Sequence, residues 1–200
     1  MEHIKNTVIA LCFVLLITAL PLKGVALEPQ SKFDHNVLTW AQQCREEILG
    51  QMERLISSGQ LREGQLFDTF YIPIPQTSPL KYHTQYDKMA DETMRLILDK
   101  YLEQDSRLLY VVIVDRNGYL PTHNTRYSQP LTGDSEVDQL NNRAKRMAND
   151  HCGLAAAHNM ESYLLQSCNM DTGRENIMEL SVPIHINGRH WGAVRIGYKK

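Results

Sequence analysis

The chain has 200 residues, of which 42% are hydrophobic and 22% are charged, and its 21 basic and 23 acidic side chains leave a formal net charge of −2. This composition is ordinary for a globular protein and excludes collagen-like, coiled-coil and wholly disordered chains. The charge balance gives no sign of the broad basic surface that nucleic acid requires, so we expect no nucleic-acid partner.

The first 26 residues are typical of an export signal. Residues 7–22 carry no charge but are few for a membrane-spanning helix, and Gly24 and Ala26 occupy the −3 and −1 positions of a signal-peptidase site. We therefore expect residues 1–26 to be a cleaved signal peptide and the rest to reach the periplasm. The alternative is an uncleaved anchor in the inner membrane, with the remaining chain facing the periplasm.

Export changes the interpretation of three cysteines, Cys44, Cys152 and Cys168. In an oxidising compartment thiols can pair, and we favour a bridge between Cys152 and Cys168 because both lie in the C-terminal half. Sequence alone does not determine the connectivity. The alternative is three buried, unpaired cysteines that pack as small apolar side chains.

Two long amphipathic helices are predicted in an N-terminal helical region, residues 27–107. Apolar residues recur at gaps of three and four over residues 34–56 and again over residues 84–103, which gives each helix one apolar stripe. Residues 67–79, between the two helices, contain three prolines and are predicted to be an extended connector.

The pattern changes to that of strands in residues 108–200. Five strands are predicted, at residues 108–114, 119–123, 163–170, 176–186 and 190–198. A helix is predicted at residues 135–149, with Val137, Leu140, Ala144 and Met147 facing inward. Successive hairpins give a five-stranded antiparallel sheet, and the amphipathic helices need its apolar face as a partner, which predicts an α+β domain.

No catalytic motif is present in the sequence. It lacks a glycine-rich phosphate loop, a G-x-S-x-G elbow and an H-E-x-x-H helix, so we assign no catalytic residue and expect a protein that is not an enzyme. The soft-ligand cluster of His151, Cys152 and His158 falls short of the four ligands of a closed zinc site, so we assign no metal.

Cationic and aromatic side chains are better candidates for a binding site. Arg143 and Arg146 are three residues apart and would share one face of the predicted helix, where they could hold the carboxylate of a small molecule. In the alternative, they pair on the surface with Asp134, Asp138 or Asp150.

The last strand adds two more candidates. Strict alternation puts Trp191 and Arg195 on the face opposite the apolar Val194 and Ile196. Trp191 and Arg195 would then lie near solvent, a dimer partner or a ligand.

Haem is the main cofactor alternative. The sequence has no C-x-x-C-H motif, so covalent c-type haem is not expected and we assign no cofactor. Non-covalent haem held by a histidine such as His123, or redox chemistry at the exported cysteines, remains an alternative function.

Several stretches of the C-terminal region resemble one family. They are GYLPTHN (118–124), RYSQPLTGD (126–134), NRAKRM (142–147), LLQSCNMDTGR (164–174) and ELSVPIHINGRHWGAVRIGY (179–198). These stretches are similar to the extracytoplasmic PAS-like or Cache-like sensor domain of certain bacterial methyl-accepting chemotaxis proteins. The resemblance implies a PAS-like sensor domain over residues 108–200, a small-molecule ligand and a homodimer formed through the N-terminal helix.

Our predicted ligand-binding residues combine these observations. They are His123, Asn124, Arg126, Tyr127, Arg143, Arg146, Trp191 and Arg195. The related receptors continue into a transmitter, whereas this sequence ends at Lys200, so we expect a sensor-type domain without its own transmitter. It would act as a soluble binding protein or as a partner of a membrane chemoreceptor. Another hypothesis is an interaction module that docks through the Val37 to Leu55 stripe.

Overall fold

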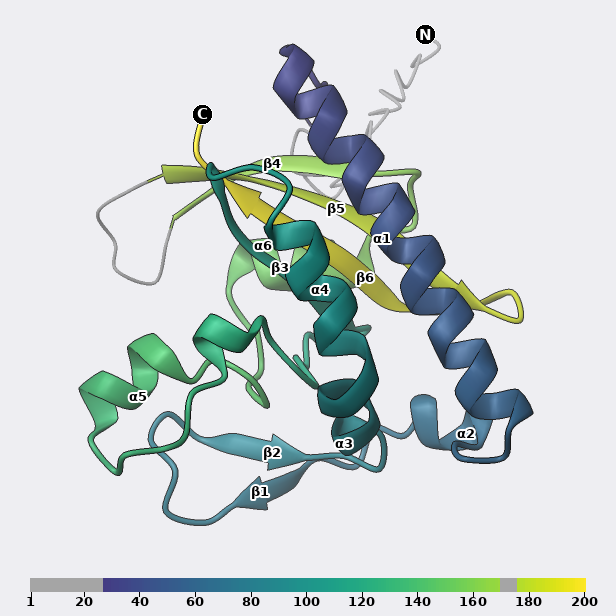
Figure 1. The fold of residues 1–200 in the computed structure, drawn as a ribbon, viewed down its shortest axis with the longest axis vertical. Helices are drawn as coiled ribbons and strands as arrows, with labels where there is room; N and C mark the ends of the chain where they lie inside the picture. The colour runs from purple at the N-terminus through teal and green to yellow at the C-terminus, as the bar shows by residue number, and fades with distance from the viewer. Residues whose placement is uncertain (1–26, 170–175) are drawn as a thin grey trace, which may run out of the picture.

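The computed structural model describes residues 27–169 and 176–200. The predicted signal peptide lies outside these ranges. The described chain is an α+β structure with one four-stranded and one two-stranded antiparallel sheet (Figure 1). The predicted fold class is therefore confirmed at the level of α+β with antiparallel sheets, although neither sheet has five strands.

The secondary-structure elements follow one another along the chain with short connections. The helices are α1 (Lys32–Ser57), α2 (Glu63–Leu66), α3 (Asp87–Met89), the π-helical turn η1 (Ala90–Met94), α4 (Arg95–Leu102), the 3-10 turn η2 (Thr125–Tyr127), α5 (Ser135–Asn141) and α6 (His151–His158). The strands are β1 (Ile72–Ile74), β2 (Lys81–His83), β3 (Leu108–Asp115), β4 (Leu164–Asn169), β5 (Asn176–Ile186) and β6 (Arg189–Tyr198).

Helix α1 forms where the periodicity predicts it. Ser31 caps its N-terminus by accepting a hydrogen bond from the Asp34 amide, and the Asp34 carboxylate accepts one from the Ser31 amide, so two otherwise unpaired donors are satisfied. The apolar stripe from Val37 to Leu55 is buried against β5 and β6. Because this stripe is part of the protein's own core, it is not free to dock on a receptor, and that hypothesis is wrong.

The four-stranded sheet has the order β3-β6-β5-β4, with every neighbouring pair antiparallel. The predicted strand at residues 119–123 is wrong. Tyr119 forms only an isolated bridge with Met147, and Leu120 exchanges hydrogen bonds with the backbone of Lys145 and Arg146. Pro121 has no amide donor to continue a ladder, so this segment pairs with residues 144–148 rather than extending the sheet.

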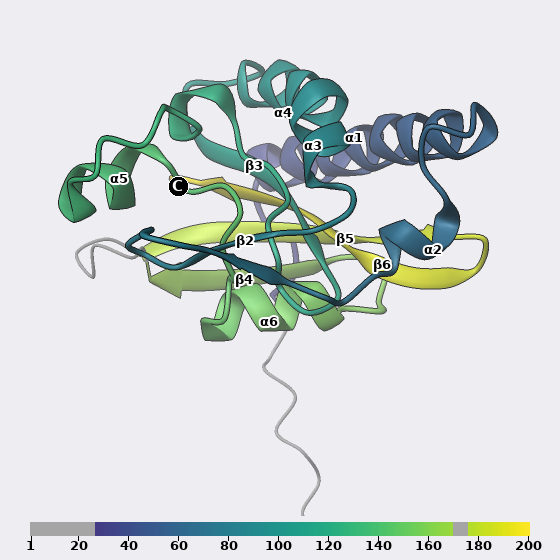
Figure 2. The same ribbon diagram turned by 90° about the horizontal axis from the view of Figure 1, so that it is seen from below.

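Helices cover both faces of the four-stranded sheet. Helices α1, α3 and α4 lie on one side and α6 lies on the other (Figure 2). The larger core lies under α1 and α4 and joins residues from the two sequence regions, 27–107 and 108–200. No helix within the described ranges is long and apolar enough to cross a membrane.

Two segments differ from the sequence predictions. The predicted extended connector at residues 67–79 instead contributes β1, which pairs with β2 as a hairpin outside the main sheet. The predicted helix at residues 135–149 ends at Asn141, because Asn142 has an extended backbone and Lys145 has a φ of 63°. Val137 and Leu140, predicted to face inward, are exposed.

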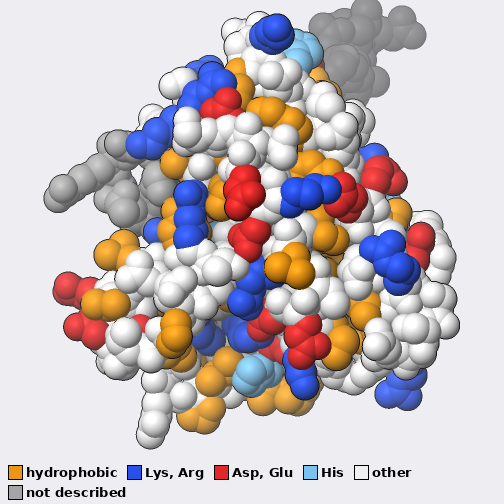
Figure 3. Space-filling view, viewed as in Figure 1, with side chains coloured by type: hydrophobic (Ala, Val, Ile, Leu, Met, Phe, Trp, Pro, Cys, Tyr) orange, Lys and Arg blue, Asp and Glu red, His pale blue; other side chains and the backbone are white. Residues whose placement is uncertain are grey.

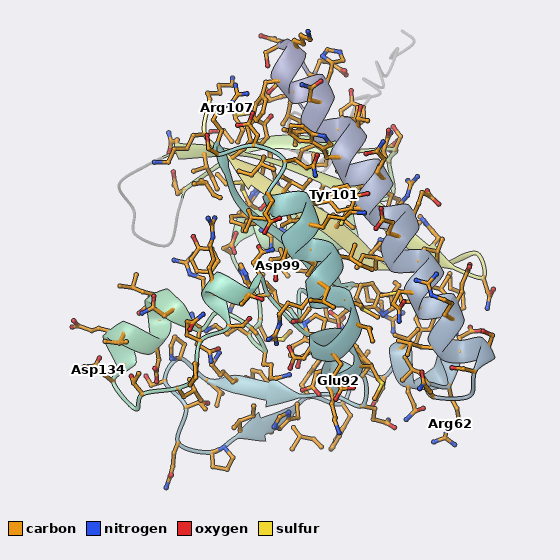
Figure 4. The ribbon with its side chains drawn as sticks, viewed as in Figure 1. Arg62, Glu92, Asp99, Tyr101, Arg107 and Asp134 are labelled. Atoms are coloured by element: carbon orange, nitrogen blue, oxygen red, sulfur yellow. A yellow bond between two sulfur atoms is a disulfide. The ribbon has the colours of Figure 1, made fainter. Side chains whose placement is uncertain are left out.

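The charged side chains on the face of Figure 1 do not form a single-sign surface. Lysine and arginine alternate with aspartate and glutamate over α1 and α4 (Figure 3). Lys100 and Glu47 form one such pair between these helices, and Glu47 also accepts a hydrogen bond from Tyr101, which is labelled in Figure 4. This face therefore lacks the basic patch that nucleic-acid binding would need.

Candidate functional site

A cavity of about 280 Å³ lies on the α6 side of the sheet. Its walls come from β3, β4, β5, β6, the start of α6 and residues 142–148, which we call the arginine segment. The lining side chains used below are Tyr110, His123, Arg143, Arg146, Cys152, Cys168, Glu179 and Arg195. The volume lies just below the ~300–1,000 Å³ usual for small-molecule sites, so the cavity suits a compact ligand.

The arginine segment is held over the sheet by its backbone. The Leu120 amide donates to the Arg146 carbonyl at 2.9 Å, and the Ala148 amide donates to the Gly118 carbonyl at 2.7 Å. Gly118 has a φ of 84°, and a Cβ there would lie 2.8 Å from the Ala148 oxygen. Glycine therefore satisfies both the left-handed backbone and the close approach that this pairing requires.

The floor of the cavity holds a buried ion pair. The Glu179 carboxylate accepts hydrogen bonds from Arg195 at 2.6 Å and from the Tyr110 hydroxyl at 2.5 Å. Glu179 is fully buried and Arg195 is 6% exposed. Burial acts against the charge of Arg195, but Glu179 and Tyr110 raise its pKa above the usual value. Arg195 is therefore charged, and its charge is matched within the pair by Glu179.

The two arginines of the segment differ in their partners. Arg146 donates to the backbone oxygens of Asp138, Gln139 and Asn142, so its guanidinium is part of the local structure. Arg143 stacks on the Tyr127 ring at 4.8 Å, and its buried Nε has no hydrogen-bond partner. Within the described ranges, no carboxylate lies within ion-pair distance of Arg143. Arg143 is thus the arginine available to a ligand.

Neither of the sequence interpretations of these arginines is correct in full. Arg143 and Arg146 both line the cavity, as the clamp hypothesis requires, but they lie on an irregular segment rather than on one helix face. The surface pairing with Asp134, Asp138 or Asp150 is absent from the described ion pairs. Arg146 donates to the backbone oxygen of Asp138, and Asp134, labelled in Figure 4, caps α5.

His123 is a buried, neutral histidine in the cavity wall. Burial, together with nearby arginines that include Arg143, holds its pKa well below the usual value. Its Nδ1 accepts a hydrogen bond from the Asn124 amide at 2.8 Å, so the neutral ring carries its proton on Nε2. His123 therefore offers a hydrogen-bond donor to a ligand.

This tautomer does not fit haem. A histidine that binds iron through Nε2 needs its proton on Nδ1, where it donates to a second group. The Asn124 amide donates to Nδ1 of His123 and fixes the opposite arrangement. The residues at this site therefore do not match the haem alternative.

A disulfide between Cys152 and Cys168 forms one wall, which confirms the favoured pairing. It ties α6 to β4, and Cys44 is the free, buried cysteine of the described chain. Because Cys152 is in the disulfide, it is not available as a metal ligand. No group of three or more metal-ligating side chains occurs in residues 27–169 and 176–200.

Among the described lining residues, the cavity carries an excess of positive charge. Arg143, Arg146 and Arg195 line it, against the carboxylates of Glu179 and Asp150. Glu179 is matched by Arg195, and Asp150 caps α6 by accepting from the Gly153 amide at 2.9 Å. An anionic group beside Arg143 would add the missing negative charge and accept hydrogen bonds from its guanidinium.

Four of the eight predicted site residues line the cavity, namely His123, Arg143, Arg146 and Arg195. Tyr127 lies behind the wall, where its ring contacts the imidazole of His123 and the guanidinium of Arg143. Asn124 is buried and structural, because it bonds the Val111 amide and Asp99, which is labelled in Figure 4. Arg126 is exposed and donates to the Leu109 carbonyl.

Trp191 is a correction, since it does not line the cavity. Its ring is buried in the larger core under the helices, and its Nε1 donates to the Leu66 carbonyl at 2.8 Å. The register of β5 and β6 passes from Ile184 opposite Gly192 to His185 opposite His190, which leaves Trp191 unpaired in a bulge. A bulge redirects a side chain to the other face, so strict alternation fails here.

Sequence reasoning missed Tyr110 and Glu179. Glu179 was detectable, because it is a lone acid in the apolar run of β5 and a buried carboxylate needs a partner. Tyr110 gave no such signal, since an aromatic residue in an apolar strand usually packs in a core.

Comparison with known proteins gives a weak likeness. No family model and no curated protein matches the chain. Among solved structures, it is similar to an extracellular ligand binding receptor from Desulfohalobium retbaense DSM5692, with 12% sequence identity and a TM-score of 0.40. The match covers 84% of this chain and 26% of that chain, so this chain spans about a quarter of the receptor's length.

Proposed function

We propose that the chain is a sensor-type domain that binds a small organic anion in the cavity between the sheet and the arginine segment. The observation that carries this proposal is Arg143, a guanidinium in the cavity wall without a carboxylate partner in the described chain. A carboxylate is the matching group, because guanidinium binds it through two parallel hydrogen bonds.

The other lining residues restrict the class of ligand further. His123 Nε2 supplies a donor, while Val112, Leu120 and Ile177 supply apolar wall. A ligand that fits these groups is a compact carboxylate with an apolar body. The ion pair of Glu179 and Arg195 would stay intact, because separating it leaves two buried charges without partners.

A thermal-shift series tests the proposal. Purified protein is heated with sodium acetate, propionate, succinate or benzoate at constant ionic strength, with sodium chloride as the reference. Selective binding to the folded state raises the melting temperature. We expect at least one carboxylate to do so, and Arg143→Ala to abolish the rise.

Arg189→Ala is the matched control, because Arg189 is exposed on β6 and lies outside the cavity lining. This variant should keep the full response. No shift with any of the four carboxylates, or an unchanged shift in Arg143→Ala, would refute anion binding at this site.

The cellular setting forms part of the same proposal. A cleaved signal peptide would release the domain into the periplasm, where it would serve a membrane chemoreceptor. N-terminal sequencing of protein from the native host would give Leu27 as the first residue, and Met1 would contradict cleavage.

A homodimer through α1 would have to use the outer, polar face of that helix, since the apolar stripe is buried. Analytical sedimentation of the purified protein would detect such a dimer.

A further inference from the structure

Lys81 in β2 is a buried lysine whose side chain reaches the arginine segment. It is 3% exposed, and its Nζ donates to Asn142 Oδ1 at 2.6 Å, to the Asn142 carbonyl at 3.0 Å and to the Ala144 carbonyl at 2.6 Å. An ammonium group has three donors, and all three are used here. No ion pair of Lys81 with a carboxylate is found in the described part of the chain.

This arrangement is unusual for a buried lysine, which normally meets a carboxylate. Here the acceptors belong to the two residues that flank Arg143. The ammonium therefore fixes the orientation of the peptide groups on both sides of Arg143. The hydrogen bonds of the Lys81 ammonium group go to the arginine segment and not to the β1–β2 hairpin, to which Lys81 belongs.

The segment needs such support because its backbone is irregular. Lys145 has a φ of 63°, which L-residues other than glycine seldom adopt and which costs about 1 kcal/mol or more. The Lys145 side chain forms ion pairs with the carboxylates of Asp87 at 3.2 Å and Asp91 at 2.8 Å. The Tyr82 amide also donates to the Lys145 carbonyl at 2.8 Å. Contacts from β2 and from α3 and η1 thus hold the segment together.

We propose that Lys81 is a positioning residue whose ammonium group holds the arginine segment in the shape that aims Arg143 into the cavity. The consequence for anion binding rests on the proposed function, whereas the positioning itself exists without a ligand. Loss of the ammonium removes the donor of Asn142 Oδ1 and of the Ala144 carbonyl and leaves the Asn142 carbonyl with Arg146, and the segment then gains access to solvent.

Hydrogen exchange followed by mass spectrometry tests this directly. The full chain is compared at pH 6 with Lys81→Met, which keeps the length and apolar stem of the side chain. We expect amide exchange in residues 142–148 to become at least about tenfold faster, with β5 and β6 unchanged. Lys88→Met is the matched control, because Lys88 is 78% exposed on α3 and makes only a 3.8 Å pair with Glu92.

Wild-type exchange rates in a folded Lys81→Met protein would overturn the proposal, and so would an equal acceleration across the whole chain. Asn142→Ala is the milder variant if Lys81→Met fails to fold, because it removes only one of the three acceptors. It should accelerate exchange in the same segment by a smaller factor, and no change there would overturn the proposal.

Chemical rescue separates the ammonium from simple packing. In Lys81→Ala, added propylammonium should restore slow exchange in residues 142–148, whereas 1-propanol of the same shape should not. Equal rescue by the alcohol would overturn the proposal. If exchange responds as expected but none of the four carboxylates binds, the positioning role stands and the proposed function falls. If a carboxylate binds through Arg143 and Lys81→Met binds it as tightly as wild type, the proposed function stands and the positioning role of Lys81 falls.

Discussion

The two faces of the four-stranded sheet are formed by the same strands but have opposite chemistry. On the α1 and α4 face, Leu180, Val182, Val194 and Ile196 build a continuous apolar core. On the α6 face, alternate positions of these strands place Glu179 and Arg195 in a buried ion pair beside a cavity. One face therefore stabilises the fold through apolar burial, whereas the other buries charged side chains, at a desolvation cost, beside a cavity.

The largest expected effect comes from breaking the ion pair of the cavity face. Glu179→Gln leaves Arg195 buried without a counter-charge, and such changes cost about 4 kcal/mol in the free energy of unfolding. Urea denaturation measures this loss. Glu53→Gln, on the exposed side of α1, is the control and should be neutral. A loss below about 1 kcal/mol would mean that water reaches Arg195.

A slightly smaller effect is expected from the apolar face. Ile48→Ala opens a void in the core under α1, where Ile48 is fully buried, and should cost about 3.5 kcal/mol. Carboxylate-induced thermal shifts should persist in this variant. Leu96→Ala, at a leucine that is 70% exposed on α4, is the matched control and should change stability by less than about 0.5 kcal/mol. Loss of binding in a folded Ile48→Ala protein would contradict the division between the faces.

The disulfide between Cys152 and Cys168 lies on the cavity face of the sheet, so its removal tests how much that face contributes to stability. Replacing Cys152 and Cys168 by alanine opens a loop with a sequence separation of 16, which the chain-entropy model values at about 3 kcal/mol. Differential scanning calorimetry of oxidised wild type and the double variant measures the difference. An equal melting temperature for the two proteins would show that the bridge contributes nothing to the folded state.

The smallest effect at neutral pH concerns Lys81. Burial, together with the nearby charges of Arg146 and Lys145, lowers the pKa of Lys81 from 10.5 to about 7. Above pH 7 the unfolded chain therefore binds a proton that the folded chain has released, so the free energy of unfolding rises from pH 7 towards 10.5. This contribution is lost as the pH falls through 7. Urea titrations from pH 6 to 10 should show a steeper rise for wild type than for Lys81→Met, and parallel curves would disprove the shift.

Regular elements with an intact period were predictable. The α1 stripe repeats at three and four residues, and β5 occupies residues 176–186 as predicted. Helix α6 was missed because Gly153 and a run of alanines carry little amphipathic signal. Gly153 is required there for a tertiary reason, since a Cβ would lie 2.4 Å from the Ala148 carbonyl oxygen.

The candidate site was half predictable. Two arginines three residues apart on a predicted helix indicated an anion site, and Arg143 and Arg146 do line the cavity, together with His123, although the segment that carries them is irregular. The predicted position of Trp191 was wrong because the bulge opposite Ile184 and His185 breaks the alternation of side chains along β6. Register between strands depends on partners far away in the chain, and a single sequence does not contain that information.

By itself, the sequence determined the chemistry available to this protein: apolar stripes that must be buried, a near-neutral charge balance, and a set of guanidinium groups in the C-terminal half. Only the tertiary structure decided which guanidinium lacks a partner. Glu179 approaches Arg195 across two strands, and backbone oxygens accept hydrogen bonds from Arg146, while the Arg143 side chain, among residues 27–169 and 176–200, stacks on an aromatic ring and has no carboxylate partner. Pairing is a property of distances in space, so the free charge emerges only when the chain has folded.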